Sequence, residues 1–227
     1  MNEWKEVKLG EYASMISEKS NIENATLQNY ISTDNMLGDF GGVINASKLP
    51  TVKMVNTFEV NDILFSNIRT YFKKVWISTF KGTVSTDVIV FRTKNINNLN
   101  EKFLYYILCN RDFTEYTVLT SKGAKMPRGD KSAIKSYHFP LPPLPEQKAI
   151  AEVLSSLDDK IDLLHRQNET LEQMAQTLFR QWFVERRPEL VEGEADEDWE
   201  EGFISDLAKH HKKSIRPQQN LDKIYHH

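Results

Sequence analysis

The chain has 227 residues, of which 40% are hydrophobic and 27% charged, as in an ordinary globular protein with one sizeable core. No apolar run approaches the roughly 18–20 residues that span a membrane, and charged residues interrupt the N-terminus where a secretory signal needs an apolar stretch. Its only cysteine, Cys109, excludes an intrachain disulfide and a thiolate metal site, so we expect a cytoplasmic protein that contacts no membrane.

The net charge of −3 is unevenly distributed. Residues 1–140 hold 18 Lys and Arg against 14 Asp and Glu, a net of +4. Residues 141–227 hold 11 against 18, a net of −7. The first part is therefore the better candidate for contact with a polyanion.

Residues 1–140 predict a mixed α/β (α+β) domain, because short apolar or alternating runs are separated by Gly, Asn, Asp and Pro. The best strand candidates, residues 57–68 and 83–93, are rich in Val, Ile, Phe and Thr. Residues 98–121 have helical spacing, with Asn100 as the N-terminal cap. Residues 38–48 predict a turn or exposed loop.

A long coiled-coil helix is predicted to follow a proline-rich stretch. Four prolines between positions 140 and 145 predict a stiff strut rather than a strand or helix. From about Glu146 to Val184, apolar residues recur in alternating steps of four and three, which predicts a helix roughly 60 Å long. This seam consists of Ile150, Leu154, Leu157, Ile161, Leu164, Asn168, Leu171, Ala175, Leu178 and Trp182.

The seam needs a covering surface. A shorter helix would pack on its own domain, but a 140-residue domain has a radius of gyration of only ~14–15 Å, so much of this stripe would stay exposed. Partner helices are therefore the favoured cover. Asn168 either fixes the register of such a pair or faces water at a gap.

Residues 198–208 repeat the residue pattern of residues 3–13. The offset is 195 residues, as between Trp4 and Trp199. The acidic stretch 191–202 has the composition of a linker. We therefore expect a long unit that begins again near the end of the sequence.

Three motifs occur in one order along the chain. Trp4 and Leu9-Gly10-Glu11 open it, Asp62-Ile63-Leu64-Phe65-Ser66 follows, and Pro-Leu-Pro-Pro-Leu-Pro-Glu-Gln at 140–147 leads into the long helix. Together they resemble the type I restriction-modification specificity subunits, most specifically in the spacer that begins at residue 140. Asn61 stands where that family usually has Gly, a change that a turn tolerates because Asn also adopts positive φ.

The resemblance implies three parts. Residues 1–140 would be a target-recognition domain, residues 141–187 a proline-rich strut with the conserved spacer helix, and residues 188–227 an acidic linker with the start of a second, incomplete target-recognition domain. The implied function is that of a half-length specificity subunit without catalytic activity of its own, which binds one half of a bipartite site in double-stranded DNA.

The resemblance also implies partners. Type I methyltransferase subunits would carry S-adenosylmethionine, and restriction subunits, the translocase and nuclease, would use ATP and Mg²⁺, so we expect no cofactor on this chain. Since one half leaves its seam exposed, we expect a homodimer through antiparallel helices and a palindromic split site.

Two basic segments independently favour DNA contact. Residues 69–81 hold four cations, with no acid between residues 63 and 86, and residues 121–135 hold five cations against Asp130. Either run alone would more often be a solvated face, but the resemblance favours DNA. The predicted DNA-facing residues are Arg69, Lys73, Lys74, Lys122, Lys125, Arg128 and Lys131, with Ser66, Asn67 and Tyr71 as candidates for base or sugar contact.

Three aromatic residues, Tyr71, Phe72 and Trp76, lie among the first cations. They could stack on bases, but core positions are the favoured interpretation. The sequence has no Walker loop, His-Glu-x-x-His helix or methyltransferase tetrapeptide, and its histidine pairs, His210-His211 and His226-His227, are expected to bind no physiological metal. The alternative function is a coiled-coil protein-interaction module without independent DNA binding.

Overall fold

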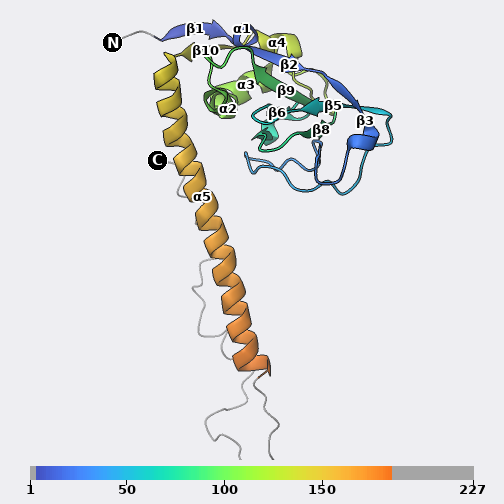
Figure 1. Cartoon of the computed structure of the whole chain (residues 1–227), viewed down its shortest axis with the longest axis vertical. Coiled ribbons are helices and arrows are strands. Elements are labelled where there is room, and N and C mark those ends of the chain that lie inside the picture. Colours follow the sequence, from blue (N-terminus) through green and yellow to red (C-terminus); the bar gives the residue numbers. More distant parts are fainter. Residues whose placement is uncertain (1–3, 186–227) are drawn as a thin grey trace, which may run out of the picture. The chain divides into compact units, whose positions relative to one another are not determined.

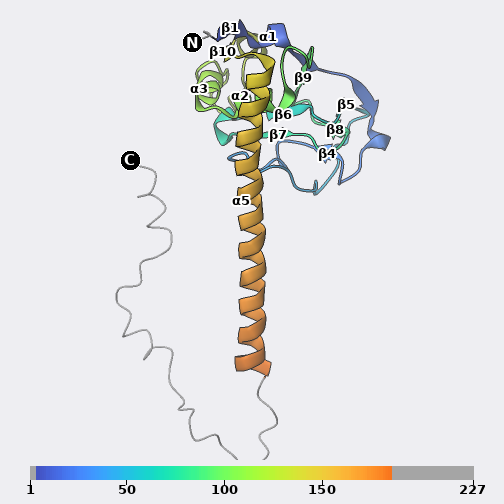
Figure 2. The same ribbon diagram turned by 60° about the vertical axis from the view of Figure 1, so that its left-hand side comes forward.

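The strands form three sheets in the computed structural model, which describes residues 4–185, with residues 183–185 described by their backbone alone (Figures 1 and 2). One sheet has the order β2 (Ala13–Ile16), β9 (Val88–Thr93), β6 (Ile63–Ser66) and β7 (Val75–Ile77), with antiparallel neighbours. A second has the order β3 (Lys19–Asn21), β5 (Met54–Phe58), β8 (Gly82–Val84) and β4 (Tyr30–Ile31). The third pairs β1 (Lys5–Lys8) with β10 (His138–Leu141).

The longer helices follow the last strand of the β6 sheet. They are α2 (Glu101–Cys109), α3 (Arg111–Leu119) and α5 (Leu144–Phe179). Shorter turns are α1 (Leu9–Tyr12), α4 (Lys131–Lys135), the 3₁₀ turns η1 (Ile22–Asn24) and η2 (Thr70–Phe72), and the π-helical turn η3 (Arg180–Glu185). The mixed α/β class with one long helix, predicted from the sequence, is confirmed.

Strand β6 lies at the centre of the domain because both of its faces are buried. Ile63 and Phe65 pack into the larger core cluster, where α2 and α3 contribute residues such as Leu104 and Phe113 (Figure 1). Leu64, on the opposite face, packs into a second cluster with Phe58 of the other sheet. The strand is therefore held between a helical layer and a second sheet, which fixes where its C-terminal end emerges.

Three predicted elements are each divided in the structure. The run 57–68 is not one strand, because Asn61 adopts φ +68° and turns the chain between β5 and β6. The run 83–93 is likewise split between β8 and β9. Asn100 caps α2 as predicted, by accepting from Phe103 N, but the helical run breaks at Asn110, whose extended backbone ends α2 and starts α3.

The proline-rich strut was predicted wrongly. His138 to Leu141 form the strand β10. Pro140 is tolerated in it because proline has no N–H that would need an acceptor. The helix α5 already begins at Leu144. Pro145 fits the first turn of a helix, whose N–H groups have no intrahelical acceptor.

Gln147 anchors the start of α5 to the domain. Its buried side chain donates from Nε2 to the carbonyls of Asn98 and Pro142, at 3.0 and 2.9 Å, and its Oε1 accepts from Asn100 N at 2.9 Å. At the surface, Trp4 Nε1 donates to Glu146 at 2.9 Å, which also ties the first strand region to the helix. Residues 145–147 therefore attach α5 to the domain, and we call this attachment the joint.

The joint continues for three turns of α5. Ala151 is buried, Ile150 packs against the larger core cluster, and Tyr106 OH of α2 donates to Asp158 at 2.7 Å. Burial, followed by the hydrogen bond to Asp158, raises the pKa of Tyr106, and burial raises the pKa of the nearby Cys109 thiol to about 12, so both stay protonated at neutral pH. The start of the predicted seam is thus partly covered by the chain's own domain.

Farther along α5 the seam is exposed. Leu157 is 55% exposed and Leu171 61%, and Ile161, Leu164, Leu178 and Trp182 are exposed to a similar degree. The chain divides into two compact units, residues 1–165 and 166–227, and the structure describes the second only as far as residue 185.

Two expectations concern membranes and metals. No helix within the described residues is long and apolar enough to cross a membrane, and residues 4–182 contain no group of three His, Cys, Asp or Glu side chains that could hold a metal ion. The predicted linker, the repeat at 198–208 and both histidine pairs lie outside the described residues.

We predict that Gln147→Ala lowers the free energy of unfolding by about 2–4 kcal/mol, because it leaves the buried carbonyl of Pro142 without a partner and removes two partly buried hydrogen bonds. Alanine propagates a helix well, so helix propensity contributes little. Urea unfolding followed by circular dichroism measures the change.

Gln173→Ala is the matched control, because Gln173 is exposed on the same helix, and we expect a change within about 0.5 kcal/mol. Equal stability of the two variants would contradict the anchoring role of Gln147.

Candidate nucleic-acid interface

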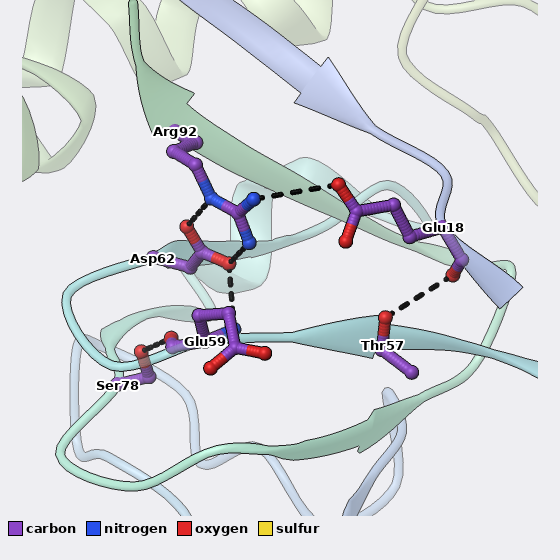
Figure 3. A network of polar contacts seen from close by, with 6 residues as sticks. All are labelled: Glu18, Thr57, Glu59, Asp62, Ser78 and Arg92. Carbon is purple, nitrogen blue, oxygen red and sulfur yellow. Dashed lines mark hydrogen bonds and ion pairs between the residues drawn. The ribbon is translucent and has the colours of Figure 1, made fainter. Parts of the chain in front are cut away.

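An ion pair between the buried Asp62 and the partly exposed Arg92 fixes the start of β6 (Figure 3). Asp62 is buried and accepts from Nε and Nη2 of Arg92 on β9, both at 2.7 Å. It also accepts from Glu59 N at 2.7 Å, so the same carboxylate closes the turn before the strand. The hydrogen bond from Arg92 to Asp62 raises the pKa of the guanidinium, which therefore stays charged. Asp62 thus sets the register of the strand that leads to the candidate site.

Weaker contacts surround this pair (Figure 3). Ser78 Oγ donates to the carbonyl of Glu59, and Ser78 N donates to the carbonyl of Asp62 at 2.8 Å. Glu18 lies 3.5 Å from Arg92 Nη1 and is largely exposed. The network therefore has one buried, bidentate pair and several supporting bonds at its edge.

The chain leaves the opposite end of β6 through a strained turn. η2 is flanked by Arg69 and Lys73, whose φ values of +50° and +52° place two non-glycine residues in the left-handed region. Such residues cost about 1 kcal/mol or more each and persist only where their surroundings hold them. Thr70, between them, is buried.

Backbone bonds from a second segment hold one side of this turn. Arg69 N donates to the carbonyl of Pro127 at 2.8 Å, and Gly129 N donates to the carbonyl of Asn67 at 3.1 Å. Lys122 and Arg128 exchange two backbone bonds of 2.8 and 2.9 Å, which closes residues 122–128 into a hairpin-like loop. The two basic segments of the sequence are therefore adjacent in the structure.

A third segment holds the other side. Asp39 N donates to the carbonyl of Phe72, and Phe40 N donates to the carbonyl of Lys73, both at 3.0 Å. Asp39 and Phe40 themselves have positive φ, so this loop is shaped to reach the turn. The loop of residues 38–48, expected to be a turn or exposed loop, is thus also a support for the site.

We call the surface formed by residues 69–74 and 122–131 the basic surface. Lys122 and Arg128 are highly exposed, and the side chain of Lys73 is 43% exposed. Lys125 and Lys131 are also exposed. All seven predicted cations lie on the two adjacent segments that the backbone bonds join.

Several of these cations are oriented by neighbouring acids or carbonyls. Lys73 Nζ lies 3.1 Å from Asp39, and Arg128 Nη2 lies 3.0 Å from Asp87. Lys122 pairs with Asp130, and this hydrogen bond, with two from backbone amides, lowers the pKa of the Asp130 carboxyl. Lys74 Nζ donates to the carbonyl of Thr33 at 2.6 Å. Exposed ion pairs of this kind stabilise a fold by only about 0–1 kcal/mol, so an anion that binds at this surface can replace the acid as the partner of the cation.

Two predicted contact residues need correction. Ser66 and Asn67 are 2% and 8% exposed, because the end of β6 is still inside the domain. Their side chains are not presented at the surface. Asn67 instead acts through its backbone, whose carbonyl accepts from Gly129 N, while its own N–H donates to the carbonyl of Asp87 at 2.9 Å.

Two of the three aromatic residues differ from the interpretation as core residues. Trp76 packs against the second core cluster, as expected, but Tyr71 and Phe72 are 47% and 45% exposed. Their place at the tip of η2, between two left-handed residues, turns both rings outward.

Asp39, Asp87 and Gly129 were missed by reasoning from the sequence. The two acids reach the basic surface from loops distant in the chain, so no local pattern marks them. A Cβ at Gly129 would lie 2.7 Å from Asn67 Oδ1 and 3.0 Å from a methyl of Ile134, so these side chains would have to shift to admit any other residue. An isolated glycine between Arg128 and Asp130 was the only signal of this close packing.

These features define a mixed α/β domain that presents a basic surface and continues into a long helix. Residues 1–173 match the family described as "Type I restriction modification DNA specificity domain". The chain therefore belongs to this family, which confirms the resemblance seen in its motifs.

Relatives and solved structures agree with this assignment. The HindI specificity subunit of Haemophilus influenzae is 29% identical over 206 residues, which are 87% of this chain and 44% of that protein. The MjaIX specificity subunit of Methanocaldococcus jannaschii is 32% identical over 129 residues, 53% of this chain and 30% of that protein. The crystal structure of the HsdS subunit from Thermoanaerobacter tengcongensis shares the fold, with a TM-score of 0.57 at 20% identity over 86% of this chain and 52% of that one. The chain spans about half the length of such relatives or less.

We predict that Asp62→Asn destabilises the domain by about 2–4 kcal/mol, because it leaves Arg92 next to a neutral group that cannot accept both of its hydrogen bonds. Chemical denaturation of the purified protein measures the change.

Glu18→Gln is the matched control, because it removes the exposed carboxylate on the same arginine, and we expect less than about 0.5 kcal/mol. If both variants lowered the free energy of unfolding by a similar amount, the pair between Asp62 and Arg92 would contribute no more to stability than the exposed contact with Glu18.

Proposed function

We propose that this chain is the DNA-recognition part of a type I restriction-modification specificity subunit and binds one half of a bipartite site in double-stranded DNA. The observation that carries the proposal is the convergence of two basic segments on one rigid surface, in a chain of the specificity-domain family.

The chemistry of the basic surface suits the phosphate backbone. Each Lys or Arg that approaches a phosphate releases condensed counterions, which gives affinity without regard to sequence. Arg69, Lys125 and Lys131 have no acidic partner within 4.0 Å among the described residues, so they are the first candidates for phosphate contact. The paired cations, Lys73, Lys122 and Arg128, are pre-oriented and can exchange a weakly bound acid for a phosphate.

The alternative is a coiled-coil interaction module in which the basic surface has no ligand. It explains the exposed seam of α5 but not the strained turn that the three segments hold in place. Strain of this kind is retained mainly at functional sites. DNA binding therefore accounts for more of the structure.

The proposed partners are a type I methyltransferase subunit and a restriction subunit. The support is that the similar proteins are named specificity subunits of type I restriction enzymes, and that one structure with the same fold comes from a study of type I restriction-modification complex assembly. S-adenosylmethionine, ATP and Mg²⁺ would then be bound by those partners. This chain would select the DNA sequence and carry out no reaction itself.

We further propose that the exposed seam of α5 pairs with the same helix of a second copy, in antiparallel orientation. From Leu157 onward the apolar seam residues are exposed, in a pattern that fits a facing helix. Two recognition domains would then lie at opposite ends of the pair and read a palindromic split site.

We predict that the chain binds double-stranded DNA with an affinity that falls steeply as salt rises. The variant Lys122→Gln/Lys125→Gln/Arg128→Gln should bind about 10–100-fold more weakly at moderate salt. Its salt slope should be shallower, by roughly one for each phosphate that is no longer neutralised. Fluorescence anisotropy at several salt concentrations measures both.

The control removes three charges elsewhere, in Lys102→Gln/Lys148→Gln/Lys160→Gln, and should bind as the parent does. If the parent protein shows no salt-dependent binding, the interaction module becomes the better function.

We predict a dimer in solution that Leu164→Asp/Leu171→Asp converts to a monomer, because two charges would be buried in the seam. The matched control, Gln173→Asp/Gln176→Asp, adds the same charge on the opposite side of the heptad and should remain dimeric. Light scattering over a dilution series gives the mass. A monomeric parent at micromolar concentration would contradict the proposed pairing.

A further inference from the structure

Tyr71 and Phe72 form an exposed aromatic tip on the basic surface. Their ring centroids are 4.7 Å apart with the planes inclined at 53°, and nearly half of each residue is open to solvent. Aromatic residues are usually placed in the core, where burying them stabilises a fold. Two adjacent exposed rings at the tip of a loop therefore indicate a surface that binds a ligand.

The tip is rigid although its rings are exposed. Both residues that flank it are left-handed, and its backbone is held by bonds to residues 39–40 on one side and to Pro127 on the other. The rings therefore need no ordering of the loop when they meet a ligand, and the entropy cost of binding is small.

The surroundings of the tip fit DNA. Lys74 Nζ lies 5.9 Å from the centre of the Phe72 ring, and Arg69 and Lys73 flank the turn directly. Cations that hold phosphates on both sides of an apolar tip would press that tip into a groove of the duplex. The charge complementarity favours a nucleic acid over an apolar protein surface.

The chemistry of Phe72 limits what this ring can recognise, whereas Tyr71 also carries a hydroxyl that can donate or accept a hydrogen bond. Phe72 has no hydrogen-bonding group, so it cannot read the donors and acceptors on base edges. The apolar feature that distinguishes one base pair from another in the major groove is the C5-methyl group of thymine. A phenyl ring in contact with that methyl would favour a thymine at one position of the half-site.

We propose that the Tyr71–Phe72 tip contacts the C5-methyl group of one or two thymines in the major groove and makes recognition sequence-specific there. This inference rests on the proposed function and assigns separate roles within it. The cations supply affinity for any duplex, and the aromatic tip supplies a preference for thymine.

The experiment starts from the half-site that the parent protein selects from a random duplex library. Each thymine in it is then replaced by uracil, which removes only the C5-methyl group and keeps the base pairing. For the parent protein, at one or two positions, we expect a loss of about fourfold in affinity for each methyl, the factor for burying one such group.

Three variants distinguish the contribution of the aromatic tip to thymine preference from the contribution of the cations to affinity. Tyr71→Ala/Phe72→Ala should bind thymine and uracil duplexes equally, and Phe72→Leu, which keeps an apolar side chain, should retain part of the preference. Lys125→Gln should bind both duplexes more weakly but keep the parent's ratio. Circular dichroism and urea unfolding confirm that each variant is folded, as expected for changes at exposed positions.

The outcomes are distinct. The inference fails if the selected half-site contains no thymine, if uracil changes nothing for the parent, or if the double alanine variant keeps the parent's ratio, and in each case the proposed function stands. If the parent binds no duplex at all, the proposed function fails and the inference falls with it.

Discussion

The ion pair between Asp62 and Arg92 is the constraint on which the position of the basic surface depends. A buried carboxylate is tolerated only when it is paired and hydrogen-bonded, and Asp62 meets this condition through one arginine and one backbone amide (Figure 3). These bonds fix the turn before β6 and its register against β9. A shift by one residue would exchange the two buried faces of β6, so the point where the chain leaves the strand is fixed as well.

The basic surface lies where the chain leaves β6, and backbone hydrogen bonds hold its shape. Three segments that are far apart in the sequence meet at η2 through backbone bonds, and Thr70 of the turn is buried. Tyr71, Phe72 and the side chain of Lys73 are each nearly half exposed at this turn. Acids such as Asp39 orient the cations without neutralising them permanently, because the pairs are exposed and weak.

The sequence predicted local features well and long-range ones poorly. The cap at Asn100 and the positive φ at Asn61 follow from a single residue and its neighbours, and both are confirmed. The motifs identified the family, and the cations could be found from their density. The contact between Arg69 and Pro127 depends on pairing across nearly sixty residues, which no local pattern reports. Ser66 was expected to be a candidate for base or sugar contact, whereas the strand that carries it is buried on both faces.

The long helix shows how one periodic pattern can serve two environments. Its seam is regular from Ile150 to Trp182, yet the first turns pack on the chain's own domain and the later residues are exposed. Gln147 accounts for the packed part, because its three hydrogen bonds to residues 98, 100 and 142 hold the first turns of α5 against the domain. On the proposed function, a loose attachment would let the distance between two half-sites read by paired copies vary, and a split DNA site of constant spacing could not be selected.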